Sequence, residues 1–156
     1  MSHTHLGQRA AVYGASSGMG RATALALARA GADVAVLARD SDALSAVAVD
    51  IETMGRRAVP IAVDVQDSKA ARDSVSNIVD VLGGIDILVY ATGWNIPKRA
   101  LEVLSASDWE LMQRTNLWGL YDVTQAALPT LRECGARLVV ISSAAVQIPD
   151  VSGVAY

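Results

Sequence analysis

Residues 9–29 read RAAVYGASSGMGRATALALAR, and this stretch decides the fold. The apolar run over residues 9–13 predicts a buried strand, and the alanine-rich segment that ends at residue 29 predicts a helix. Between them lies the glycine-rich loop Gly14-Ala15-Ser16-Ser17-Gly18-Met19-Gly20. Such a loop turns sharply and points backbone N–H groups and the positive end of the helix dipole at an anion. We therefore predict that it binds the pyrophosphate of a dinucleotide, although glycines that serve only a tight turn and helix packing are the alternative.

Strand-like and helix-like segments alternate along the rest of the chain. Four further apolar runs predict strands, over residues 33–38, 58–63, 86–90 and 137–142. The spacing of apolar residues predicts helices from an N-cap at Ser41 to a stop at Gly55, from Ser68 to Gly83-Gly84, and from Ser107 to Glu133. This alternation implies right-handed crossovers. The predicted fold class is α/β, a three-layer Rossmann-like doubly wound parallel sheet, in a single dinucleotide-binding domain over residues 1–156.

The composition is that of an ordinary globular protein. The chain has 156 residues, 52% of them hydrophobic and 19% charged, which suffices for one buried core. A formal net charge of −3 argues against a nucleic-acid partner. Cys134 is the one cysteine, so we expect no intramolecular disulfide, and no Cys/His cluster predicts a metal site. No apolar run approaches a membrane span and no signal peptide is recognisable, so we expect a cytoplasmic protein with no membrane partner.

The spacing of Gly14, Gly18 and Gly20 resembles that of the classical short-chain dehydrogenase/reductase family. Further motifs of that family follow in order: Asp64-Val65 after the third predicted strand, Ala91-Thr92-Gly93 after the fourth, Asn116 within the long helix, and Ser143 and Tyr156 after the fifth strand. The match covers nearly the whole chain. The resemblance implies an oxidoreductase that transfers a hydride between a nicotinamide cofactor and a small carbonyl or alcohol substrate. A catalytically inactive dinucleotide-binding or oligomerisation module is the alternative.

The resemblance also implies residue roles. Ser143 would hydrogen-bond the substrate oxygen, Tyr156 would transfer the proton, and Asn116 would hold a water and the helix backbone in a proton relay. The residues that it implies in cofactor binding are Gly14, Ser16, Ser17, Gly18, Met19, Gly20, Arg39, Asp64, Val65, Ala91 and Gly93. Asn116 lies four residues from both Met112 and Leu120, which predicts an inward side chain, so a satisfied buried amide also explains it. Ser142 competes with Ser143 for the substrate contact.

The choice of cofactor depends on the end of the second predicted strand. A carboxylate there accepts a hydrogen bond from a ribose hydroxyl, whereas a cation attracts a 2′-phosphate. In the alignment with the family, Ala38 occupies the usual acidic position and Arg39 follows it. This favours NADP(H) over NAD(H). Two alternatives stay open: Asp40 would approach the ribose after a slip of one residue, and Arg39 would simply be solvated. Asp64 resembles the aspartate that contacts the adenine end, or it caps the following turn.

Two positions depart from the family pattern. Tyr13 stands where a threonine commonly precedes the first glycine, and Tyr90 stands where an asparagine often begins the motif that ends at Gly93. Both changes remove polar side chains that normally brace the loop backbone. They therefore bear on the rigidity of the loop and on its affinity for the cofactor.

Tyr156 is the last residue, and the family places a lysine four residues after this tyrosine to lower its pKa. We therefore expect residues 1–156 to be the leading part of a longer enzyme, with the C-terminal part of the fold absent from this chain, and to be inactive alone. A naturally short, inactive relative is the alternative. In the family the long helix, which here carries Trp118 and Tyr121, often pairs with its copy, so we expect a homodimer or homotetramer at full length. Trp118 and Tyr121 would then belong to the interface; the alternative is that they belong to the core.

Overall fold

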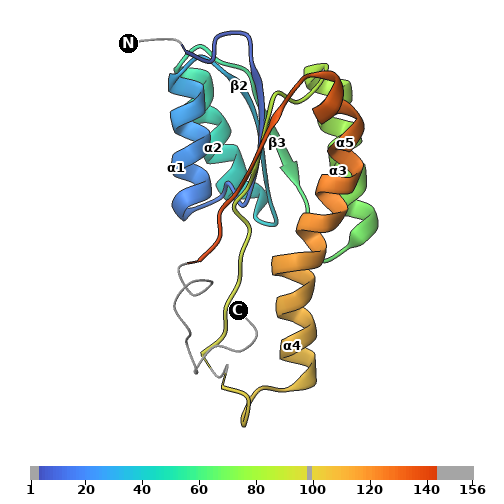
Figure 1. The fold of residues 1–156 in the computed structure, drawn as a ribbon. Coiled ribbons are helices and arrows are strands. Elements are labelled where there is room, and N and C mark those ends of the chain that lie inside the picture. The colour runs from blue at the N-terminus through green and yellow to red at the C-terminus, as the bar shows by residue number, and fades with distance from the viewer. Residues whose placement is uncertain (1–3, 98–99, 144–156) are drawn as a thin grey trace.

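The structure is a computed structural model that describes residues 4–97 and 100–143. Five parallel strands form its centre (Figure 1). Along the chain they are β1 (Arg9–Tyr13), β2 (Asp33–Ala38), β3 (Ala58–Ala62), β4 (Ile87–Tyr90) and β5 (Arg137–Val140). Their order in the sheet is β3-β2-β1-β4-β5, with parallel pairing throughout. The order reverses between β1 and β4, which is the switch point of a doubly wound sheet. The fold class predicted from the sequence is confirmed.

Helices cover both faces of the sheet. The helices α1 (Gly18–Arg29) and α2 (Ser41–Thr53) pack on one face, and α3 (Ser68–Leu82) and α5 (Gly119–Glu133) pack on the other (Figure 1). A further helix, α4 (Ala106–Gln113), continues into α5 through a π-helical turn, η1 (Arg114–Trp118), and extends beyond the end of the sheet. Among the described residues, no helix is both long and apolar enough to cross a membrane.

The strand sequences explain why both faces of the sheet are covered. In β1, Ala10 and Val12 belong to the core beneath α1 and α2, whereas Ala11 and Tyr13 belong to the core beneath α3 and α5. Successive side chains of a strand point to opposite faces, so a sheet buried on both faces requires an uninterrupted apolar run. Pro60 lies in β3 at one edge of the sheet, where its missing N–H is tolerated.

The other edge of the described sheet is formed by β5, whose apolar side chains are exposed. Leu138 is 42% exposed, Val139 47% and Val140 42%. In the described part of the chain, β5 pairs with β4 on one side and with no strand on the other. An apolar, unpaired strand edge is a surface that proteins normally cover.

The structure differs from the predicted boundaries in a few places. The strands β3 and β5 end before residues 63 and 142, and β4 begins one residue after 86. The predicted N-cap at Ser41 is wrong, because the Asp40 carboxylate accepts hydrogen bonds from the backbone N–H groups of Asp42 and Ala43 at 3.1 and 3.0 Å. Both residue types cap helices, but the one that reaches these two N–H groups is Asp40. The long helix starts at Ala106 and is interrupted by η1, which the prediction of one helix from 107 to 133 did not include.

Candidate functional site

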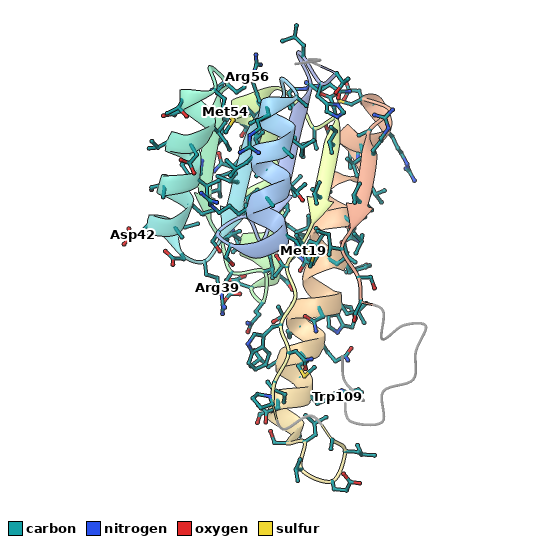
Figure 2. All side chains as sticks on the ribbon, turned by 90° about the vertical axis from the view of Figure 1, so that its left-hand side faces the viewer. Met19, Arg39, Asp42, Met54, Arg56 and Trp109 are labelled. Carbon is teal, nitrogen blue, oxygen red and sulfur yellow. The ribbon has the colours of Figure 1, made fainter. Side chains whose placement is uncertain are left out.

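A pocket of about 780 Å³ lies at the carboxyl ends of β1, β2 and β4, beside the switch point of the sheet. Open α/β sheets bind their ligands at this place. All the residues that the family resemblance implied in cofactor binding line it: Gly14, Ser16, Ser17, Gly18, Met19, Gly20, Arg39, Asp64, Val65, Ala91 and Gly93. Figure 2 shows Met19 and Arg39 at this end of the molecule. The fold therefore brings together residues from four separate connections of the chain.

The glycine loop forms one wall of the pocket with its backbone. A Cβ on Gly14, whose φ is 80°, would lie 2.8 Å from the carbonyl carbon of Ala91. A Cβ on Gly20 would come still closer to the carbonyl oxygen of Gly14, at 2.1 Å, so α1 packs directly on the loop. At Gly18 no atom of the described residues lies within 4 Å of the Cβ position. The protein itself thus requires the first and third glycines, whereas the space at Gly18 is open to a ligand.

The N-terminus of α1 borders this loop without a side-chain cap. Ser17 is the N-cap residue, but its side chain makes no capping hydrogen bond, and the first turn contains no acidic residue. In contrast, the side chains of Asp40, Asp67 and Ser105 cap α2, α3 and α4. The first N–H groups of α1 are therefore available, and together with the helix dipole they attract an anion. This arrangement fits the pyrophosphate of a dinucleotide.

Arg39 and Asp40 lie side by side at the end of β2 but differ in what they contact. The carboxylate of Asp40 is engaged in capping α2. Arg39 is exposed at the pocket and forms no ion pair with any residue that the structure describes. After the neighbouring strand β3, Asp64 lines the pocket while its carboxylate accepts the backbone N–H of Gln66 at 3.0 Å, so it also closes the turn that follows β3. Arg39, a cation, is therefore the one of these three side chains that has no described partner.

Asn116 contacts the pocket through Trp94. The amide oxygen of Asn116 accepts the backbone N–H of Trp94 at 2.8 Å, and its amide nitrogen donates to the Trp94 carbonyl at 2.9 Å. Trp94 lines the pocket, and Asn116 is half-buried behind it. These two bonds satisfy the oxygen and the nitrogen of the amide, as the alternative to a catalytic role requires, although Asn116 is half-buried rather than buried. A role of Asn116 in a proton relay stays a prediction.

Tyr13 and Tyr90 form a buried pair beside the pocket. Their rings stack with centroids 6.0 Å apart, and burial raises the pKa of both phenols above the ordinary value. The Tyr13 hydroxyl lies 2.7 Å from Ser74 Oγ, and the Tyr90 hydroxyl donates to the Thr115 carbonyl at 2.8 Å. The hydroxyl of Tyr13 therefore bonds to α3 and that of Tyr90 to η1, so the two tyrosines link β1 and β4 to the helices that cover them.

The expected reacting pair is only partly placed by the structure. Ser143 follows β5 and is half-buried, next to an exposed Ser142, whereas Tyr156 lies outside the described residues. Sequence reasoning missed Leu111 and Thr115, which line the pocket from α4 and η1. They are four residues apart and therefore share one helix face, and this spacing is the sequence feature that could have indicated a common position in the pocket. Within the described ranges, no group of three or more His, Cys, Asp or Glu could hold a metal ion.

Comparison with known proteins identifies the family. The family model described as short chain dehydrogenase matches residues 8–156, which is nearly the whole chain. The chain belongs to the short-chain dehydrogenase/reductase family. The resemblance inferred from the glycine spacing is therefore confirmed.

Individual relatives of this short-chain dehydrogenase/reductase include enzymes and cofactor complexes. L-rhamnose 1-dehydrogenase (NAD(P)(+)) from Sphingomonas sp. (strain SKA58) is 37% identical over 141 residues, which cover 88% of this chain and 55% of the relative. The crystal structure of a short chain dehydrogenase from Burkholderia cenocepacia J2315 in complex with NADP has a TM-score of 0.86 and 36% identity, covering 96% of this chain and 61% of that one. Carveol dehydrogenase from Mycobacterium avium in complex with NAD has a TM-score of 0.91 and 26% identity, covering 97% and 60%. The chain spans about half the length of the curated relatives it matches.

Proposed function

We propose that the whole protein is an oxidoreductase that transfers a hydride between NADP(H) and a carbonyl or alcohol group of a small molecule in the cytoplasm. Solved relatives in complex with NAD and with NADP support a nicotinamide cofactor. The observation that carries the preference for NADP(H) is the contrast between two neighbours. Arg39 has no described ion-pair partner at the pocket, while the Asp40 carboxylate is used by the N-terminus of α2.

The residues of the pocket divide the work of binding between its two ends. The α1 N-terminus and the backbone at Gly18 hold the pyrophosphate, because N–H groups and a positive helix end meet there. Arg39 forms charge-assisted hydrogen bonds with the 2′-phosphate, which a guanidinium can bind with two N–H groups at once. The bound cofactor supplies or accepts the hydride. Ser143 donates a hydrogen bond to the substrate oxygen, and the Tyr156 hydroxyl exchanges the proton with that same oxygen.

Arg39→Ala tests this proposal by calorimetric titration with NADPH and NADH. We expect NADPH to lose on the order of 1.5–3 kcal/mol of binding free energy, the range of a hydrogen bond to a charged group, and NADH to lose much less. Arg57→Ala is the matched control, because Arg57 is also exposed but does not line the pocket. Equal losses for both cofactors would make Arg39 a structural residue. Tighter binding of NADH than of NADPH by the wild-type chain would instead favour Asp40 as a ribose ligand.

The long helix supports the further proposal that the whole protein is a homodimer or homotetramer. Along α4, η1 and α5, large apolar side chains are exposed, among them Trp109 at 41%, Trp118 at 49% and Tyr121 at 51%. Figure 2 shows Trp109 on α4. Trp118 and Tyr121 pack edge to face, with ring centroids 5.8 Å apart. Exposed apolar surface of this kind commonly forms an interface. Analytical ultracentrifugation should show that the assembly of the Tyr121→Ser variant dissociates. The assembly of the control Leu6→Ser, a substitution at a similarly exposed apolar side chain, should stay intact. An intact assembly of Tyr121→Ser would contradict the proposal.

A further inference from the structure

The π-helical turn η1 changes the partner of one backbone N–H group. In an α-helix, the N–H of residue 119 would bond to the carbonyl of residue 115, four positions earlier. Here the N–H of Gly119 bonds to the carbonyl of Arg114 instead. The Thr115 carbonyl therefore loses the donor that a regular helix would provide, and Thr115 is a buried residue. A buried carbonyl needs a hydrogen-bond donor from elsewhere.

Tyr90 supplies that donor from β4. Its hydroxyl donates to the Thr115 carbonyl at 2.8 Å, and its side chain is almost completely buried. The helix leaves room for the hydroxyl at Gly119, where a Cβ would lie 2.5 Å from Tyr90 Oη. The Tyr90 ring stacks on Tyr13. The Ser74 hydroxyl donates to the Ala71 carbonyl, so the Tyr13 hydroxyl donates to Ser74 Oγ and anchors the ring pair to α3.

The same π-helical turn also holds part of the pocket wall. Asn116 follows Thr115 directly and bonds to both backbone groups of Trp94. Thr115 and Trp94 both line the pocket, on the β4 side of the switch point. Arg39 and Asp64 lie on the opposite side, at the ends of β2 and β3. A dinucleotide whose pyrophosphate lies at the glycine loop and whose 2′-phosphate lies at Arg39 therefore places its nicotinamide half beside Trp94 and Thr115.

We propose that Tyr90 is a positioning residue for the nicotinamide half of the cofactor. Its hydroxyl holds the Thr115 carbonyl in the η1 turn, and the next residue of that turn, Asn116, holds the backbone of Trp94. The inference rests on the proposed function, because that function decides which half of the pocket takes the nicotinamide. Tyr90 does not itself line the pocket. Its effect reaches the ligand through two hydrogen-bonded steps, Tyr90 to Thr115 and Asn116 to Trp94.

The test compares Tyr90→Phe with Thr130→Val in the full chain, titrated with NADPH and with 2′,5′-ADP, which represents the adenosine half alone. Tyr90→Phe should weaken NADPH binding about fivefold, the factor that corresponds to one neutral hydrogen bond, and leave 2′,5′-ADP within about twofold of the wild type. Thr130→Val also removes one buried hydroxyl, from a part of α5 that does not line the pocket, and should change neither affinity. Hydrogen exchange of the Trp94 amide should accelerate in Tyr90→Phe and not in Thr130→Val.

Asn116→Ala gives an independent second variant. It should show the same pattern, with NADPH weakened and 2′,5′-ADP unchanged, and adding Tyr90→Phe to it should weaken NADPH little further, because both residues act in one sequence of contacts. Unchanged NADPH affinity in either single variant, equal losses in Tyr90→Phe and Thr130→Val, or additive effects in the double variant would overturn the positioning role alone. A wild-type chain that binds neither compound would overturn the proposed function, and the positioning role with it.

Discussion

The pocket has two backbone walls that are stabilised in opposite ways. The loop from Gly14 to Gly20 depends on missing side chains, because backbone approaches backbone where a Cβ would not fit. The turn η1 depends on side chains that are present, because the hydroxyl of Tyr90 and the amide of Asn116 bond to backbone groups of distant segments. Adding an atom should therefore damage the loop, and removing an atom should damage the turn.

Gly20→Ala should have the largest effect on stability. Its Cβ would lie 2.1 Å from the Gly14 carbonyl oxygen, so either the loop or α1 must shift. We expect a loss of about 3 kcal/mol in the free energy of unfolding, measured by urea denaturation. Gly18→Ala is the matched control: its φ of 52° makes an alanine strained, but no atom in the described part of the chain lies within 4 Å of the new Cβ, so the loss should be about 1 kcal/mol. Similar losses in both variants would show that the close contact at Gly20 does not support the loop.

The two walls also differ in how far the sequence predicts them. The glycine loop and the strands follow local rules, since a strand, a glycine-rich turn and an apolar helix lie next to one another in residues 9–29. The η1 turn follows no local rule, because the donor to the Thr115 carbonyl is Tyr90, which lies 25 residues earlier. The sequence does not decide the N-cap of α2, for a different reason. Asp40 and Ser41 are adjacent and both residue types cap helices, so only the geometry shows that Asp40 is the cap.

Alkaline pH should expose the dependence of the second wall on its buried phenols. Burial raises the pKa of Tyr13 and Tyr90 above the ordinary value of 10.0, so the unfolded chain loses these protons at lower pH than the folded one. The contribution of the two protonated phenols to the free energy of unfolding is therefore complete below about pH 10. It falls as the pH rises further, by up to about 1.4 kcal/mol per pH unit for each tyrosine. Urea denaturation at a series of pH values should show this slope, reduced in Tyr13→Phe and in Tyr90→Phe. An unchanged slope in both variants would assign the alkaline loss to other groups.

Ser17→Ala should have the smallest effect and sharpens the description of the first wall. Ser17 occupies the N-cap position of α1, yet its side chain makes no capping hydrogen bond, whereas Ser105 accepts the backbone N–H of Asp108 at 3.1 Å in α4. The same serine-to-alanine change should therefore cost about 1 kcal/mol of unfolding free energy at Ser105 and less than about 0.5 kcal/mol at Ser17. Thermal or urea denaturation of the two variants measures the difference. Equal losses would mean that the Ser17 side chain caps α1 in solution, and the N–H groups assigned to the pyrophosphate would then already have a partner.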